Sequence, residues 1–349
     1  MKKQNSNQPE VSKCQTKAVG ENTPGSYGVE RVLMAASEVT DWSLKMFSIP
    51  LWWKETRGEG IKVAILDTGI AYNHPDLSHA IMEWKDFTGS KCGPADMDGH
   101  GTHVAGIIAA QKNGQGVVGI APKAKLLIGK VLGDKGVGSF EALAKGIHWA
   151  IEKNADIISL SLQNAGENEA VHEAIKEAKN KGIFVICAAG NKGPHIDTVK
   201  FPALYPETIA VGAIDRRLKV PRYSSRGIRV DLVAPGEEIL STYPPKIYAV
   251  LSGTSMAAPF VSGVTALLIA KHRKYGGETP IKTQADLLEH LGRTAIDIGA
   301  AGLDPRSGFG LINPEDLLKY EDEGDSRIPE LVEPVRSNAS VLKLPYWCN

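Results

Sequence analysis

The stretch Ile61-Lys62-Val63-Ala64-Ile65-Leu66 decides the fold class of this 349-residue chain, because it is a near-continuous apolar run of strand length. Such a run is typical of a buried strand in a parallel sheet, where helices cover both faces. It ends at Asp67-Thr68-Gly69, which puts a carboxylate at the C-terminal end of the strand. Sites in parallel sheets form at that end, so Asp67 is a candidate site residue.

The same pattern recurs along the chain. Residues 125–132, 155–162 and 182–189 form three more apolar runs of strand length. Between them, residues 140–153 and 170–181 carry apolar side chains at helical spacing. This alternation predicts βαβ units, and therefore an α/β fold with a mainly parallel twisted β-sheet and helices on both faces.

The two ends of the chain differ from its middle in composition. Residues 1–26 are polar and short of large apolar side chains, which predicts an N-terminal arm. Residues 27–320 carry the apolar patterns and form one predicted domain. Residues 321–349 begin with acidic residues and contain prolines, which predicts a solvated C-terminal tail whose apolar end, 342–347, is free to dock on the domain.

Composition argues against several classes of protein. Lys+Arg and Asp+Glu both number 40, so a net charge of zero gives no indication of a nucleic-acid or membrane partner. No apolar run approaches the roughly 18 residues of a membrane span, and the first ten residues lack the apolar segment of a secretory signal. The four cysteines have no spacing typical of a metal site or a disulfide framework. We therefore expect a cytoplasmic location, although a secreted mature form that had lost its signal would show the same sequence.

Two further polar segments interrupt the apolar pattern. Gly253-Thr254-Ser255-Met256-Ala257 precedes the apolar run 261–270, which predicts a buried helix. Ser255 would then lie near a helix N-terminus, where unpaired N–H groups and the positive dipole end stabilise an oxyanion. From this segment alone, a simple N-cap is the plainer interpretation. The other segment, Asp98-Gly99-His100-Gly101-Thr102-His103, supplies an imidazole.

Together these segments supply Asp67, His100 and Ser255 in that order along the chain, the order that subtilisin has. They resemble the motifs of the subtilases, the subtilisin-like serine proteases. The resemblance extends over residues 27–318 and is strongest from Trp52 onward. It implies a subtilisin-like three-layer fold and a serine endopeptidase. Because neither a long folding prodomain nor a secretory signal is visible, the sequence is most similar to the intracellular members of the family.

The resemblance also implies a role for each residue. His100 would take the proton of Ser255 and later pass it to the leaving amine, while Asp67 would hold the imidazole in the correct tautomer. Asn191, at the end of the predicted strand 182–189, would form an oxyanion hole with the Ser255 backbone N–H. From its own context, an asparagine after glycine is equally an ordinary turn signal.

Two other histidines need separate interpretation. His103 follows His100 by three residues and shares its face of the predicted helix, so spacing alone cannot choose between them. The resemblance assigns catalysis to the first, and we interpret His103 and His74 as structural histidines. A metal site at the pair is disfavoured because the HExxH pattern is absent.

Two segments resemble the edges with which subtilases hold substrate. An extended peptide would pair with both edges by main-chain strand addition. The residues concerned are Gly136, Val137 and Gly138 in the first segment, and Ser161, Leu162 and Gln163 in the second. The family pattern has two glycines where Gln163 and Asn164 stand, which predicts narrower outer pockets and a restricted choice of substrates.

The resemblance also implies that Lys192, directly after Asn191, lies at the rim of the pocket for the residue before the scissile bond. Subtilisins often carry glutamate at that position. A flexible ammonium there would favour an acidic substrate side chain over a basic one, by about 1 kcal/mol or less. The alternative is that Lys192 points to solvent and has no effect on substrate choice.

A structural Ca²⁺ site is a further implication. The segment 111–122 and the preceding Asp76 resemble the principal calcium loop of the family. The implied donors are a carboxylate, an amide and backbone carbonyls, which are hard oxygen ligands that suit Ca²⁺. The implied ligand residues are Asp76, Gln111, Asn113, Gln115 and Val117. The alternative is a glycine-rich turn beside a surface aspartate. No organic cofactor is expected.

The expected partners are polypeptide substrates, with neither nucleic acid nor membrane, and a terminal tail is a candidate for self-inhibition. One alternative belongs to another class: a restrained or non-catalytic subtilase scaffold that binds a partner peptide in the same groove. The enzyme is favoured by the complete set Asp67, His100, Ser255 and Asn191. The scaffold remains an alternative because of Gln163 and the two tails.

Overall fold

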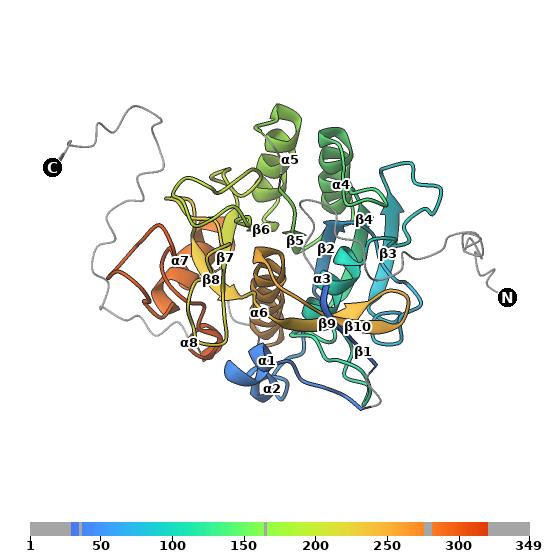
Figure 1. Ribbon diagram of the computed structural model, residues 1–349, viewed down its shortest axis with the longest axis horizontal. Coiled ribbons are helices and arrows are strands. Elements are labelled where there is room, and N and C mark those ends of the chain that lie inside the picture. The colour runs from blue at the N-terminus through green and yellow to red at the C-terminus, as the bar shows by residue number, and fades with distance from the viewer. Residues whose placement is uncertain (1–28, 35–36, 164–165, 276–280, 320–349) are drawn as a thin grey trace. The chain divides into compact units, whose positions relative to one another are not determined.

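The computed structural model describes residues 29–34, 37–163, 166–275 and 281–319 (Figure 1). At its centre lies a seven-stranded sheet with the order β3-β4-β2-β5-β6-β7-β8, in which every pair is parallel. The predicted α/β fold class is therefore confirmed. The strands are β2 (Lys62–Asp67), β3 (Ile81–Asp86), β4 (Lys125–Lys130), β5 (Ile157–Leu160), β6 (Phe184–Ala188), β7 (Ile209–Ile214) and β8 (Leu232–Pro235).

Helices cover both faces of this sheet (Figure 1). α4 (Phe140–Glu152) and α5 (Glu169–Asn180) pack together on one face, while α3 (His100–Ala109) and α6 (Thr254–Tyr275) pack on the other. α4 and α5 begin after the N-cap residues Ser139 and Asn168, whose side chains accept hydrogen bonds from the backbone N–H groups of Ala142 and Val171 respectively. The shorter helices are α1 (Trp42–Met46), α2 (Ile49–Trp52), α7 (Gln284–Thr294) and α8 (Pro314–Lys319).

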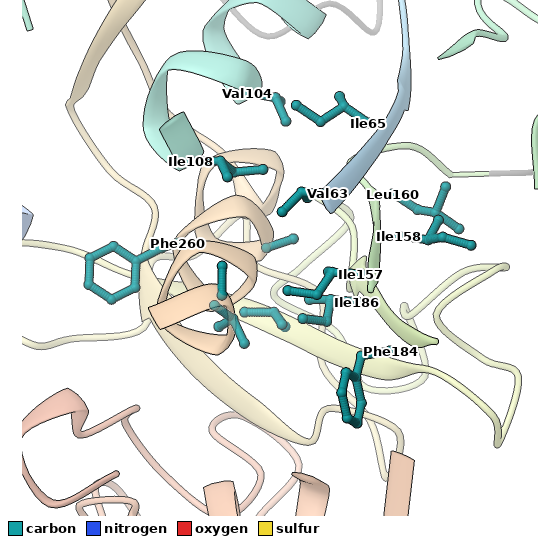
Figure 2. Close-up of a cluster of buried hydrophobic side chains, with 14 of the residues drawn as sticks. Val63, Ile65, Val104, Ile108, Ile157, Ile158, Leu160, Phe184, Ile186 and Phe260 are labelled. Carbon is teal, nitrogen blue, oxygen red and sulfur yellow. The ribbon is translucent and has the colours of Figure 1, made fainter. Parts of the chain in front are cut away.

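α6 is the central helix of the core. Figure 2 shows Phe260 of α6 with Val104 and Ile108 of α3 and Val63 of β2, and all four side chains are buried. By length and composition α6 would also suit a membrane span, which the sequence analysis did not expect. However, 89% of its apolar window is buried inside the protein. A helix that is enclosed on all sides has no polar face, so its composition resembles that of a membrane helix.

A second, antiparallel sheet joins distant parts of the chain. β1 (Val29–Leu33) pairs with β10 (Ile247–Leu251), which in turn pairs with β9 (Ile239–Tyr243). The first pair of this register is Val29 with Leu251. The N-terminal strand thus supports the segment that leads directly into α6 and Ser255.

The cysteines depart from the sequence analysis. Cys187 is a free thiol in β6, and burial raises its pKa. Cys92 is disulfide-bonded, although the spacing of the cysteines did not indicate a disulfide framework. Every other cysteine lies far from Cys92 in the sequence, and therefore no short spacing could have indicated a bridge. The predicted arm 1–26 and tail 321–349 lie outside the described residues.

Candidate active site

Asp67 and His100 form a buried pair at the carboxyl end of the sheet. Asp67 is the last residue of β2 and His100 the first of α3. His100 Nδ1 lies 2.8 Å from Asp67 Oδ1 and 3.0 Å from Oδ2. Burial alone would lower the pKa of His100, but the carboxylates of Asp67, Asp98 and Asp96 outweigh it and raise the pKa above its ordinary value. The pair therefore holds Nδ1 protonated and leaves Nε2 as the basic atom.

The nucleophile candidate Ser255 lies in the first turn of α6. Its Oγ donates to the Ser161 carbonyl at 3.3 Å, and Ser161 Oγ donates to the Ser255 carbonyl at 2.9 Å. The end of β5 is therefore tied to the start of α6. Ser255 and His100 line the same cavity.

That cavity has a volume of about 250 Å³ and lies where six segments meet. It contains His100, Ser255 and Asn191 together, and Gly136, Ser161, Leu162 and Gln163 from the two predicted substrate edges. Five further lining residues were not singled out by the sequence analysis: Thr68, Leu132, Ala188, Gly190 and Thr254. Two of these, Thr68 and Thr254, directly adjoin Asp67 and Ser255 in the sequence, and that adjacency is the signal that could have identified them.

Asn191 has a fixed orientation within this cavity. Its Oδ1 accepts hydrogen bonds from Thr254 N and Thr254 Oγ1, both at 3.0 Å. The Thr254 hydroxyl in turn accepts from Gly190 N at 3.0 Å. Because both donors hold the oxygen, the Nδ2 amide group is directed away from Thr254 and stays available as a hydrogen-bond donor in the cavity.

Comparison with known proteins assigns the family. The model of the subtilase family matches residues 58–310, which include Asp67, His100, Asn191 and Ser255. This chain belongs to the subtilase family. The predicted resemblance is thereby confirmed, and with it the assignment as a subtilisin-like serine peptidase, because the family is one of serine peptidases.

Several curated proteins are similar to this subtilase. An intracellular serine protease of Paenibacillus polymyxa is 47% identical over 232 residues, which cover 64% of this chain and 71% of that protein. The major intracellular serine protease of Bacillus subtilis (strain 168) is 44% identical over 308 residues, or 85% of this chain and 95% of its own length. Subtilisin Savinase of Lederbergia lenta is 40% identical over 258 residues, or 74% of this chain and 90% of its own.

The two predicted substrate edges flank the cavity. Residues 133–138 form a hairpin in which Gly133 N donates to Val137 O at 2.8 Å and Leu132 bridges to Gly138. The Val137 side chain is 75% exposed. Val137 and Gly138 stay outside the cavity lining, as does Lys192, which is exposed beyond Asn191. Asn164 lies outside the described residues.

His103 and His74 contact backbone rather than the cavity. His103 Nε2 lies 3.1 Å from both Ile239 O and Ala249 O, and it joins α3 to β9 and β10. Burial lowers the pKa of His103 to about 3, so its ring is neutral. His74 Nε2 lies 3.1 Å from Ile247 O. Both rings thus act as buried cross-links between elements.

The implied calcium ligands gather around Asp76, whose side chain is fully buried. Its carboxylate accepts hydrogen bonds from Asn113 Nδ2 at 3.0 Å and Val117 N at 2.9 Å. Its backbone carbonyl accepts from Gln111 N at 2.8 Å. A Cβ at Gly116 would lie only 2.1 Å from Asp76 Oδ2, so the loop wraps closely around this carboxylate.

This donor set suits a hard cation in its chemistry. One carboxylate, one amide and the carbonyls of the loop offer the oxygen ligands that Ca²⁺ prefers. Within the described ranges, no group of three or more His, Cys, Asp or Glu side chains could hold a metal ion. An ion at Asp76 would therefore depend on neutral oxygens. The Asn113 amide now turns its nitrogen toward Asp76 and its oxygen toward Gln115 N, so it would have to rotate to become a ligand.

Proposed function

We propose that this subtilase is an endopeptidase that cleaves extended polypeptide segments with Ser255 as nucleophile, His100 as general base and Asp67 as the orienting carboxylate. The observation that carries this proposal is the buried contact between His100 Nδ1 and Asp67, in a cavity that Ser255 shares. A serine hydroxyl is a poor nucleophile near neutral pH, and it needs an adjacent base whose own tautomer is fixed.

The steps follow from this arrangement. On binding of substrate, the Ser255 hydroxyl exchanges the Ser161 carbonyl for His100 Nε2. Its oxygen attacks the scissile carbonyl carbon while Nε2 takes the proton, and the Asp67 carboxylate stabilises the resulting imidazolium. The imidazolium then gives that proton to the leaving amine as the peptide C–N bond breaks. Water, activated by His100 in the same manner, hydrolyses the acyl-enzyme.

The oxyanion of the tetrahedral intermediate requires donors that are already in place. We propose Asn191 Nδ2 and the Ser255 backbone N–H for this role. The proposal is supported by the two bonds from Thr254 to Asn191 Oδ1, which leave Nδ2 as the donor toward the cavity. Donors fixed before the reaction stabilise developing charge without reorganisation.

Polypeptide binding is supported by the two edges of the cavity. Backbone groups of the hairpin 133–138 and of Ser161 to Gln163 flank the space between His100 and Asn191. An extended peptide lying there adds a strand between them, and the side chain of Gln163 narrows one end. The substrates would accordingly be unfolded or flexible segments of polypeptide.

Covalent labelling tests the proposed mechanism. A fluorophosphonate should label the purified protein at Ser255, and both Ser255→Ala and His100→Ala should abolish labelling and peptide hydrolysis. Circular dichroism establishes that each variant is folded. Retained turnover in Ser255→Ala would overturn the mechanism, and failure to label the folded wild type would favour a scaffold that binds peptides without cleaving them.

Two further proposals accompany this function. We propose a structural Ca²⁺ at Asp76 and the loop 111–117, supported by the oxygen donors gathered there. We propose an intracellular location, supported by the two relatives named as intracellular serine proteases. Self-inhibition by the tail 321–349 concerns residues outside those described, and it stays a prediction from sequence.

A further inference from the structure

Thr68 lies at the centre of a network behind the candidate base. Its backbone N–H donates to Asp67 Oδ1 at 2.7 Å. Its hydroxyl donates to Asp96 Oδ1 at 2.9 Å and accepts from Gly101 N at 2.8 Å. Its carbonyl accepts a hydrogen bond from Lys130 Nζ. Every polar group of this residue is thus engaged with Asp67, with the start of α3 or with a buried charge.

The first buried charge is Asp96, which is 3% exposed and has no part in the steps described above. Besides the Thr68 hydroxyl, it accepts the N–H groups of Asp98 at 3.1 Å, Gly99 at 2.8 Å and Thr102 at 2.8 Å, and also the Thr102 hydroxyl. A carboxylate is unfavourable in the interior unless such donors satisfy it. These donors surround the first turn of α3, so Asp96 fixes the turn that carries the base.

The second buried charge is Lys130, whose side chain has no exposed surface. Its ammonium contacts the Thr68 carbonyl and lies 3.1 Å from Asp134 Oδ1. Asp134 also accepts a hydrogen bond from Ser90 Oγ at 2.9 Å. Since Asp134 belongs to the hairpin at the cavity edge, Lys130 joins that edge to the strand end at Thr68. Burying an ammonium is costly, and packing alone does not explain its presence here.

We propose that Asp96 and Lys130 are positioning residues of the catalytic apparatus, which hold the Asp67 carboxylate against His100 through Thr68 and place opposite charges behind it. Neither residue lines the cavity itself, and both contact the lining residue Thr68. The inference rests on the proposed function, because only a catalytic His100 converts its own protonation into a change of rate.

The opposite charges make the inference testable. The carboxylates of Asp67, Asp98 and Asp96 raise the pKa of His100, and His103 beside it is neutral. Lys130 adds a positive charge behind Thr68. Removing the negative charge of Asp96 should lower the pKa of His100, and removing the positive charge of Lys130 should raise it. A merely structural role would impair both variants without moving this pKa in opposite directions.

The experiment measures kcat/KM on a small chromogenic peptide between pH 5 and 9 for the wild type, Asp96→Asn and Lys130→Met. On the acidic side of the pH profile, kcat/KM rises as His100 loses its proton; this rise is the acid limb. The acid limb should move to lower pH in Asp96→Asn and to higher pH in Lys130→Met, each by about half a pH unit or more. At its optimum pH, each variant should lose about ten- to a hundredfold in kcat, since displaced groups react slowly, while KM changes little. Thr68→Ser should recover most of the kcat lost in Thr68→Val, because only serine keeps the hydroxyl.

Matched controls separate positioning from stability. Asp156→Asn removes a carboxylate that accepts the Lys62 N–H at 2.7 Å at the other end of the sheet. Lys271→Met removes an ammonium that donates to the Leu318 carbonyl at 2.6 Å. Both controls should keep the wild-type kcat and acid limb. Fluorophosphonate titration counts the active sites, so kcat refers only to folded protein.

The outcomes distinguish the two hypotheses. If Ser255→Ala is inactive but the acid limb moves in the same direction in both variants, or in neither, the positioning role is wrong and the proposed function stands. If Ser255→Ala retains turnover, the proposed function itself fails. Opposite shifts, with an intact fold and an unchanged KM, would support Asp96 and Lys130 as positioning residues.

Discussion

In the proposed mechanism, a single imidazole determines the pH at which this subtilase works. His100 is buried, which by itself disfavours the charged ring, yet the carboxylate of Asp67 lies 2.8 Å away and those of Asp98 and Asp96 add to it. The combined effect of these carboxylates is larger than that of burial, so the pKa of His100 lies above the ordinary value. A general base must be neutral before it can accept a proton, and therefore the raised pKa shifts the onset of activity to higher pH.

The first prediction concerns the acid limb of the pH profile. kcat/KM should rise with pH through a single ionisation above pH 6.5, the ordinary value for histidine. Asp98→Asn should move the limb toward lower pH, because it removes one of the charges that stabilise the imidazolium. Peptide hydrolysis at constant ionic strength measures both effects. A wild-type limb below pH 6 would contradict this account of His100.

At the scale of elements, α3 is anchored by a histidine that does not titrate near neutral pH. His103 Nε2 contacts carbonyls of β9 and β10, and burial lowers its pKa to about 3. The unfolded chain protonates this ring below about pH 6.5, whereas the folded protein does not. Stability from the neutral ring is therefore fully present above pH 6.5 and is lost as the pH falls toward 3.

The second prediction follows from that linkage. Between pH 6 and 4, this one residue should lower the free energy of unfolding by about 1.4 kcal/mol for each pH unit. His103→Gln keeps an amide donor and has no proton to gain, so its stability should be lower at pH 7 but fall less steeply with acid. Urea unfolding at several pH values measures both slopes. Parallel slopes would show that His103 does not contribute.

The segment that carries Lys192 is basic beyond this one residue. Lys192 N donates to Ser225 Oγ at 3.1 Å, and Arg226 donates to the Pro194 carbonyl at 3.0 Å, so the segment lies against Arg226. Burial, together with the charges of Arg306 and Arg222, lowers the pKa of Arg226. Among the described residues, none of these four cations forms an ion pair within 4.0 Å. This surplus of positive charge begins directly after Asn191.

The third prediction concerns substrate choice. Peptides with Glu before the scissile bond should be cleaved several-fold faster than those with Lys, since one partly exposed pair contributes about 1 kcal/mol or less. Lys192→Glu should reverse the ranking, and added salt should shrink both differences. Lys179→Glu, at the far end of α5, serves as the control with the same change of charge. An unchanged ratio in Lys192→Glu would place its side chain in solvent.

The sequence predicted some elements well and others not at all. The strands β2, β4, β5 and β6 and the helices α4 and α5 were predicted because burial and periodicity are local properties. The pairing of β1 with β10 was missed, since it joins residues more than 200 positions apart and leaves no local pattern. The hairpin of β9 and β10 is local, but the sequence analysis did not identify it. Asp96 was missed for a similar reason: its role depends on contacts with Thr68 and the first turn of α3, which spacing does not show.

At the scale of the whole molecule, the calcium proposal predicts a ligand-dependent stability. A ligand that binds only the folded state stabilises it by RT ln(1 + [L]/Kd), which is about 2.7 kcal/mol at a hundredfold excess over Kd. The melting temperature should then rise by roughly 5 °C or more with Ca²⁺ and fall with a chelator. Asp76→Ala should abolish the response, whereas Asp316→Ala in α8 should keep it. A melting curve indifferent to Ca²⁺ and chelator would refute the site.

The site is assembled from parts of the chain that are synthesised at different times. Asp67 and His100 precede Ser255 by more than 150 residues, and β10, which leads to Ser255, completes a sheet begun by β1. A ribosome adds about 5–20 residues per second, so roughly 10–30 s pass between translation of the histidine and translation of the serine. In the proposed mechanism, the emerging polypeptide has a base but no nucleophile during that interval. A nascent chain is therefore harmless to itself and to its neighbours on the polysome until the last third of the domain has been made.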